Sequence, residues 1–214
     1  MAKIESSFAR LPMLYIADGH HRTAAAARVS QARAGVGQSG FFLAVLFPED
    51  QVQILPYHRV LRDLNGLTRH QFLSALAQSG ELVSGGEGQP GQSGEVGVFL
   101  GGEWQTLRLN RDRGEAGGPA DRLDVARLQR EVLAPLLGID DPRTSQRIAF
   151  VGGIRGPKEL ERLVLSGEYA CAFAMRSTTI SELLEVAESG GIMPPKSTWF
   201  EPKLRDGMFS HLLA

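Results

Sequence analysis

The stretch LPMLYIADGHHRTAAAARV, residues 11–29, sets the local fold at the start of the chain. Its first part, Leu11–Ala17, is a short apolar run of the kind found in buried strands. Four consecutive alanines, Ala24–Ala27, favour helix because alanine loses no side-chain entropy there. The sequence therefore predicts a strand, a turn at Asp18-Gly19 and a helix that begins near His20.

Strands and helices alternate along the rest of the chain, and two hairpins interrupt the order. The first predicted hairpin joins Phe41–Phe47 to Gln51–Leu55, and the second joins Glu95–Leu100 to Trp104–Leu109 around Gly101-Gly102. This order predicts an α+β (mixed α/β) fold rather than a uniform parallel sheet. Further helices are expected over residues 67–76, 124–136 (with Asp124 able to cap it), 157–163 and 179–190 (with a Thr179–Glu182 capping box), and further strands over 147–151 and 169–175.

Glycine-rich stretches suggest where the chain divides. The 25 glycines cluster, and the stretch 84–94 alone holds five of them, which is typical of a surface loop. We therefore expect a strand-turn-helix and hairpin region over residues 1–83 and a C-terminal α+β region over residues 95–214. The two regions are expected to pack as one unit.

Composition excludes several classes of protein. The chain has 214 residues, 43% of them hydrophobic and 22% charged, with a formal net charge of −1. It has no apolar run near the ~20 residues that span a bilayer and no apolar leader, so we expect a soluble, cytoplasmic protein. The neutral balance argues against nucleic acid as a partner. The one cysteine, Cys171, lies in an apolar run and is interpreted as a buried small hydrophobe rather than a nucleophile.

The segment Asp18-Gly19-His20-His21-Arg22 is the strongest candidate site. The first turn of a helix has unbonded N–H groups and partial positive charge, which attract anions. Gly19 would let a phosphate approach the backbone, Arg22 could grip it with paired donors, and His20 or His21 could donate a further hydrogen bond. Asp18 would serve as a general base toward a hydroxyl or as a ligand for Mg²⁺. The alternative is that Asp18 caps the helix and the histidines only pack.

A zinc site is not expected, because Asp18, His20 and His21 are too close in sequence to supply three ligands from one helix start. A second polar cluster lies in the proline-rich segment 193–207. Its prolines fix an extended backbone that could hold Lys196, Ser197 and Lys203 toward an anionic ligand. The alternative is a C-terminal arm held by aromatic residues, with solvated lysines. His58 and Arg59, after a predicted strand, could reach a ligand or form a rim salt bridge.

Five segments in one order resemble a family of bacterial and archaeal proteins, domain of unknown function 1015. They are YIADGHHR (15–22), LPYHRV (55–60), LLGIDDPR (136–143), FVGGIRG (150–156) and GIMPPKSTWFEPKL (191–204). Members of that family usually carry a substantial region before the Asp-Gly-His-His-Arg strand. The resemblance therefore implies that this chain corresponds to the C-terminal portion of the family pattern.

The Asp-Gly-His-His-Arg segment also resembles, more distantly, the ParB and sulfiredoxin-like superfamily, which includes the free-serine kinase. There the equivalent strand-turn-helix binds nucleotide phosphates. The resemblance implies that Asp18 is the base or the metal-linked carboxylate, and that Gly19, His20, His21 and Arg22 cradle phosphate. We take Asp18 and His20 as candidate catalytic residues, with Asp18 the candidate Mg²⁺ ligand and ATP or ADP the expected nucleotide.

Two functions compete at this stage. One is a phosphotransferase that acts on a small hydroxylated, serine-like metabolite, and the other is a non-catalytic nucleotide-binding regulatory module. DNA binding in the ParB manner ranks below both because no basic helix-turn-helix is apparent. A chain that is part of a longer architecture would also expose apolar surface, which self-association into a homo-oligomer would bury.

Overall fold

The computed structural model describes residues 2–110, 117–205 and 207–212. The chain forms two compact units. One contains Met1–Val52 together with Pro202–Ala214, and the other contains Gln53–Glu201. We call them the first and second units. The glycine-rich stretch 84–94, where the sequence suggested a division, lies within the second unit. Residues 111–116 of another glycine-rich stretch lie outside the described residues.

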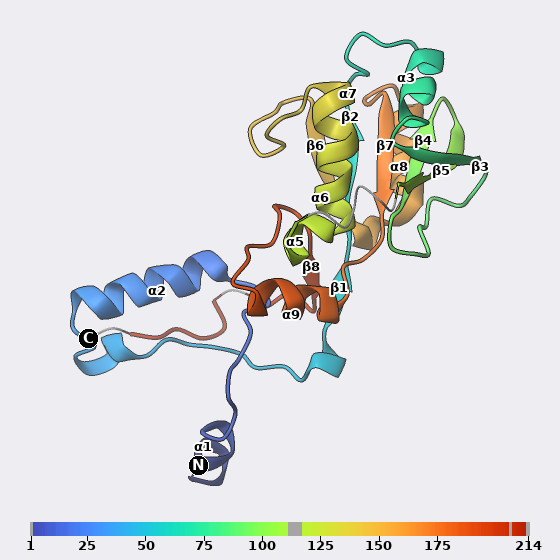
Figure 1. Ribbon diagram of the computed structural model, residues 1–214. Coiled ribbons are helices and arrows are strands. Elements are labelled where there is room, and N and C mark those ends of the chain that lie inside the picture. Colours follow the sequence, from blue (N-terminus) through green and yellow to red (C-terminus); the bar gives the residue numbers. More distant parts are fainter. Residues whose placement is uncertain (1, 111–116, 206, 213–214) are drawn as a thin grey trace. The chain divides into compact units, whose positions relative to one another are not determined.

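The second unit is built on a six-stranded sheet with the order β3-β5-β4-β7-β2-β6 (Figure 1). Each neighbouring pair is antiparallel, which confirms the predicted α+β class over a uniform parallel sheet. The predicted hairpin at Gly101-Gly102 is also confirmed, because both glycines have positive φ, 61° and 88°, as a tight two-residue hairpin turn requires. The strands are β2 (Tyr57–Leu61), β3 (Gly80–Ser84), β4 (Glu95–Leu100), β5 (Glu103–Leu109), β6 (Ile148–Gly152) and β7 (Cys171–Met175).

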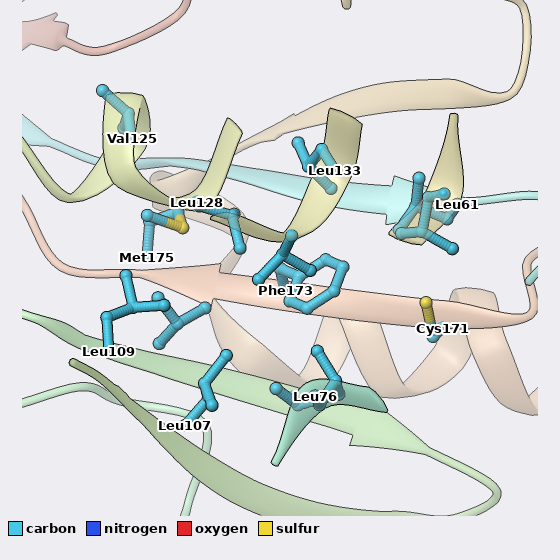
Figure 2. Packing of buried hydrophobic residues seen from close by; sticks show 14 of the residues in the cluster. Leu61, Leu76, Leu107, Leu109, Val125, Leu128, Leu133, Cys171, Phe173 and Met175 are labelled. Carbon is cyan, nitrogen blue, oxygen red and sulfur yellow. The ribbon is translucent and has the colours of Figure 1, made fainter. Parts of the chain in front are cut away.

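Helices cover both faces of this sheet. The central strand β7 alternates between them, since Cys171, Phe173 and Met175 contact one layer while Ala172 and Ala174 face the other. Figure 2 shows Phe173 beneath Leu128 and Leu133. One face is covered by α3 (Arg69–Leu76) and the continuous helix of α6 (Asp124–Leu128), η3 (Gln129–Leu133) and α7 (Ala134–Leu137), and the other by α8 (Gly156–Leu165). The other helices that the structure describes in this unit are α5 (Pro119–Arg122), η4 (Gly153–Arg155) and α9 (Ile180–Glu188).

The long covering helix widens to a π-helix at η3, Gln129–Leu133. Pro135 follows it and has no N–H to donate to the carbonyl of Glu131, four residues earlier. That carbonyl instead accepts a hydrogen bond from the Ser79 hydroxyl at 3.0 Å. Such π segments are frequent at functional sites, and this one places Gln129 beside a cavity that Arg59 also lines.

Helix caps were predicted with mixed success. The Thr179–Glu182 capping box at the start of α9 is present in both directions, as predicted. The predicted cap at Asp124 is wrong, because the N-cap of α6 is Leu123. The Asp124 carboxylate is buried and instead accepts from the Gly94 N–H at 2.7 Å and pairs with Arg176 at 3.1 Å. A buried charge with these partners holds a loop and a strand end to the helix, which sequence spacing does not show.

The first predicted hairpin is wrong. The strand β1 (Gln53–Leu55) pairs with β8 (Trp199–Glu201) near the other end of the chain, and residues 41–47 form no strand. The predicted strand at Leu11–Ala17 is likewise an extended segment with no strand pairing. The apolar composition of residues 11–17 and 41–47 indicated extended backbone, but a strand also needs a hydrogen-bonded neighbouring strand. Among the described residues, no strand pairs with either segment.

The first unit contains α1 (Ala2–Phe8), α2 (His20–Ala32), η1 (Gly37–Gly40) and η2 (Glu49–Gln51). Helix α2 begins at His20, as the alanine run predicted. The unit buries little of its apolar surface, and large apolar side chains remain exposed, from 40% at Tyr15 to 76% at Phe209. In the described part of the whole chain, no helix has the length and apolar character needed to cross a membrane.

Candidate functional site

The Asp18-Gly19 turn is joined to the C-terminal segment within the first unit. The Lys203 ammonium contacts a carboxylate oxygen of Asp18 at 3.1 Å, although the two residues are 185 positions apart in sequence. The other carboxylate oxygen accepts from the Gly19 N–H at 2.7 Å. The structure thus brings together candidates from the two predicted clusters, one acidic and one basic.

Gly19 is the N-cap of α2 and has a left-handed backbone, with φ at +86°. A residue with a Cβ is strained in this region, so the turn favours glycine. No side chain caps the helix, so the alternative interpretation of Asp18 as an N-cap is wrong. The first turn of α2 therefore presents backbone N–H groups in the way that attracts anions elsewhere.

Arg22 lies over this turn. A Cβ added to Gly19 would be 3.2 Å from an Arg22 guanidinium nitrogen, so the guanidinium covers the side of the glycine where a side chain would be. His20, His21 and Arg22 are all exposed. The helix start thus carries three exposed cationic or hydrogen-bonding side chains next to one carboxylate.

The electrostatics of the turn keep Asp18 ionised. Partial burial opposes the charge, but hydrogen bonds from Lys203 and Gly19 and the positive charges of Lys203 and Arg22 outweigh it and lower the pKa of Asp18 below its usual value. A carboxylate with a low pKa is a weak base, because proton transfer is most effective when the catalytic pKa lies near the working pH. The same carboxylate is well suited to bind a cation or orient a donor.

Lys196 and Ser197, the other predicted contacts, lie in the second unit. The Ser197 side chain is buried and its hydroxyl donates to the Pro194 carbonyl within the same turn. Lys196 has a positive φ of 54°, and its ammonium lies 5.1 Å from the centroid of the Tyr57 ring. Their predicted contact with a nucleotide stays a prediction.

His58 and Arg59 depart most from what the sequence suggested. Both are buried in β2, so Arg59 forms no rim salt bridge. The His58 Nδ1 accepts from the Met175 N–H at 3.1 Å. Burial, and then the charge of Arg59, lower the pKa of His58 to about 4, so the ring is neutral. The sequence did not lead us to expect His58 and Arg59 in the interior. The only signal of their burial was their position inside an otherwise apolar strand.

The described residues contain no cluster of three or more histidine, cysteine, aspartate or glutamate side chains placed to hold a metal ion. A cation at Asp18 would thus take most of its ligands from a bound phosphate or from water, as Mg²⁺ commonly does.

The comparison with protein families decides the identity. A family described as "Protein of unknown function (DUF1015)" matches residues 1–126. The chain belongs to this family. The match includes the first two resembling segments, at 15–22 and 55–60, whereas the segments at 136–143, 150–156 and 191–204 lie beyond it. Among curated proteins no match is found.

Solved structures give this DUF1015 chain a fold relative. A "Free serine kinase in complex with AMP" is 17% identical with a TM-score of 0.51, covering 93% of this chain and 78% of that one. A point mutant of that kinase, also in complex with AMP, has the same identity and TM-score, covering 89% of this chain and 69% of that one. A conserved hypothetical protein from Pyrococcus furiosus is 15% identical, covering 86% of this chain and 68% of that one, with a TM-score of 0.47. The similarity to the kinase extends over most of the chain and shows a shared fold.

Proposed function

We propose that the Asp18–Arg22 turn, together with Lys203, binds the phosphates of an adenine nucleotide. The observation that carries the proposal is the start of α2, which has no side-chain cap and lies beside Arg22 and the Asp18–Lys203 pair. Guanidinium and ammonium groups next to a helix N-terminus are the donors that phosphate prefers. The solved fold relatives hold AMP, which supports an adenine nucleotide as the ligand to test first. We also propose that this turn is related to the phosphate-binding turn of the ParB and sulfiredoxin-like superfamily.

The reaction that fits these groups is phosphoryl transfer to the hydroxyl of a small, serine-like metabolite. The bond from the terminal phosphorus to the bridging oxygen breaks, a bond from that phosphorus to the hydroxyl oxygen forms, and the hydroxyl proton leaves. Asp18 would hold Mg²⁺ and orient the hydroxyl, since its low pKa makes it a weak base. His20, exposed at the first turn of α2, is the proposed proton acceptor because an imidazole nitrogen can accept a proton from a hydroxyl.

A second function is favoured by one observation. Asp18 is already engaged by Lys203 and by the Gly19 N–H, as expected of a group that shapes a binding turn. The alternative is thus a regulatory module that binds nucleotide without transferring phosphate. Lys196 and Ser197 of the second unit stay proposed as phosphate contacts, separately from the turn in the first unit.

Calorimetric titration with ATP, ADP and AMP, with and without Mg²⁺, tests the binding step. Arg22→Ala should weaken nucleotide affinity about ten- to a hundredfold, the usual loss for a charge-assisted contact. Arg28→Ala is the matched control, since Arg28 is an exposed arginine of the same helix outside its first turn. Absence of binding by the wild type, or equal losses in the two variants, would contradict the proposal.

Transfer is tested by ³¹P NMR of reactions that contain nucleotide and either L-serine or L-alanine, which differ by the accepting hydroxyl. A phosphomonoester that forms only with serine, and much more slowly in Asp18→Asn, supports the phosphotransferase. Nucleotide binding that survives in Asp18→Asn, with no ester in any sample, supports the regulatory module.

A further inference from the structure

Arg59 is a charged residue inside the second unit, on the sheet face covered by the α6–α7 helix. It pairs in register with Phe150 of β6 and Phe173 of β7, and only 4% of it is exposed. Its guanidinium donates to the Tyr57 carbonyl and, at 3.1 Å, to the Lys196 carbonyl. The guanidinium carbon lies 5.5 Å from the centroid of the Phe150 ring.

No carboxylate in the described part of the chain pairs with this guanidinium. A buried charge is costly unless an opposite charge or a set of hydrogen bonds compensates it. Two carbonyls use two of the five N–H donors of an arginine, and the aromatic ring contributes only a partial negative charge. Burial lowers the pKa of Arg59 to about 10, which still leaves the group charged at neutral pH. The site therefore has positive charge and donors to offer an anion.

A cavity of about 40 Å³ lies against this group. Besides Arg59 it is lined by one other polar side chain, Gln129 of the π-helix, and by apolar groups that include Val125, Leu133 and Phe150. The Gln129 amide nitrogen donates to the carbonyls of Ile139, at 2.6 Å, and Asp140, at 3.3 Å. Its buried amide oxygen has no hydrogen-bond partner among the described residues. The cavity thus has one charged lining group, the Arg59 guanidinium, between mainly apolar walls.

The size of the cavity limits what can enter. A water needs roughly 10–15 Å³ of such space, so the volume holds about three waters or a group of similar size. A carboxylate with one short substituent fits this volume. The planar fork of an arginine matches the two oxygens of a carboxylate, and apolar walls strengthen the attraction by excluding water.

We propose that this cavity binds the carboxylate of a small organic acid, with the Arg59 guanidinium holding the carboxylate oxygens. The site lies wholly within the second unit and does not depend on the nucleotide site proposed for the first. Free small acids and a carboxylate side chain of another polypeptide share this chemistry, and the test separates the two sources.

The test uses the full chain labelled with ¹⁵N, including the arginine side chains, and titrated with acetate, acetamide and inorganic phosphate. Saturable shifts of the Arg59 side-chain N–H signal and of the Gln129 amide are expected with acetate. Acetamide, of the same shape but uncharged, should leave the signals in place. Shifts with acetamide equal to those with acetate, or with phosphate only, would overturn the proposal.

Variants give a second, independent measure. Arg59→Met should weaken acetate binding at least tenfold. Arg62→Met should change it less than twofold, because Arg62 also lies over an aromatic ring and donates to a carbonyl but is exposed. Equal effects of the two variants would count against the site. If Arg59→Met does not fold, Arg59→Lys takes its place and should weaken acetate binding several-fold, because an ammonium keeps the charge but lacks the planar pair of donors.

A competition experiment distinguishes a free acid from a carboxylate side chain of another polypeptide. A free-acid site binds acetate at a midpoint independent of protein concentration. A site filled by another copy of this chain gives an acetate midpoint that rises with protein concentration, together with a faster-sedimenting species that acetate dissociates. Failure of acetate to compete or bind at any protein concentration contradicts both.

Discussion

The neutral, buried His58 makes the stability of the second unit depend on pH. Its ring nitrogen accepts from the Met175 N–H, and burial together with the charge of Arg59 lowers its pKa from 6.5 to about 4. Between these two pH values the unfolded chain binds a proton that the folded chain does not. The free energy of unfolding therefore falls as pH decreases from 6.5 toward 4.

The size of the effect follows from that pKa difference. Between pH 7 and pH 5 the unfolded histidine becomes almost fully protonated while the folded one stays neutral, which costs about 2 kcal/mol of stability. Urea unfolding of the wild type at the two pH values, followed by circular dichroism, measures this loss. His58→Asn keeps an acceptor for the Met175 N–H but has nothing to titrate, so its stability should change far less between pH 7 and pH 5.

His70 supplies the control, because it is an exposed histidine of the same unit. His70→Asn should retain the full pH dependence of the wild type. An equal loss of stability in the wild type and in His58→Asn would refute the reasoning, since the proton would then be taken up elsewhere.

Three further outcomes are expected. Gly19→Ala should lower the free energy of unfolding by about 1 kcal/mol because of the left-handed backbone, which urea unfolding measures. It should also weaken nucleotide binding by displacing Arg22, which calorimetry measures. Unchanged affinity would contradict the geometry of the turn. Thr179→Ala should destabilise by about 1 kcal/mol through loss of the α9 cap, whereas Thr179→Ser should retain most of it in the same unfolding assay. Cys171 is fully buried, which raises the pKa of its thiol, so a thiol reagent should label it only after unfolding; rapid labelling of the folded chain would show that the core opens.

Local signals predicted much of the fold correctly. The alanine run placed the start of α2 at His20, the Gly101-Gly102 pair placed the β4–β5 turn, and the Thr179–Glu182 box placed α9. Each of these features depends on residues within a few positions of one another. The Phe41–Phe47 run was misassigned because its apolar pattern does not say which strand, if any, lies beside it.

The candidate site was only partly predictable for the same reason. The Asp-Gly-His-His-Arg motif is local, so the sequence indicated its place at a helix start. That Lys203 pairs with Asp18 across 185 positions could not be read from spacing. The interior position of Arg59 was also hidden, because a charged residue in a strand normally faces solvent.

The sequence by itself determined the class of fold, the helix that begins at His20 and the cluster of groups at its start, since these follow from backbone propensity and short-range spacing. Tertiary structure alone decided which strands pair, as with β1 and β8, and which charges face each other. It also decided where charge is buried, leaving the Arg59 guanidinium beside a cavity and without a carboxylate partner among the described residues. Pairing and burial depend on contacts between residues far apart in the chain, and short-range patterns carry no information about those contacts.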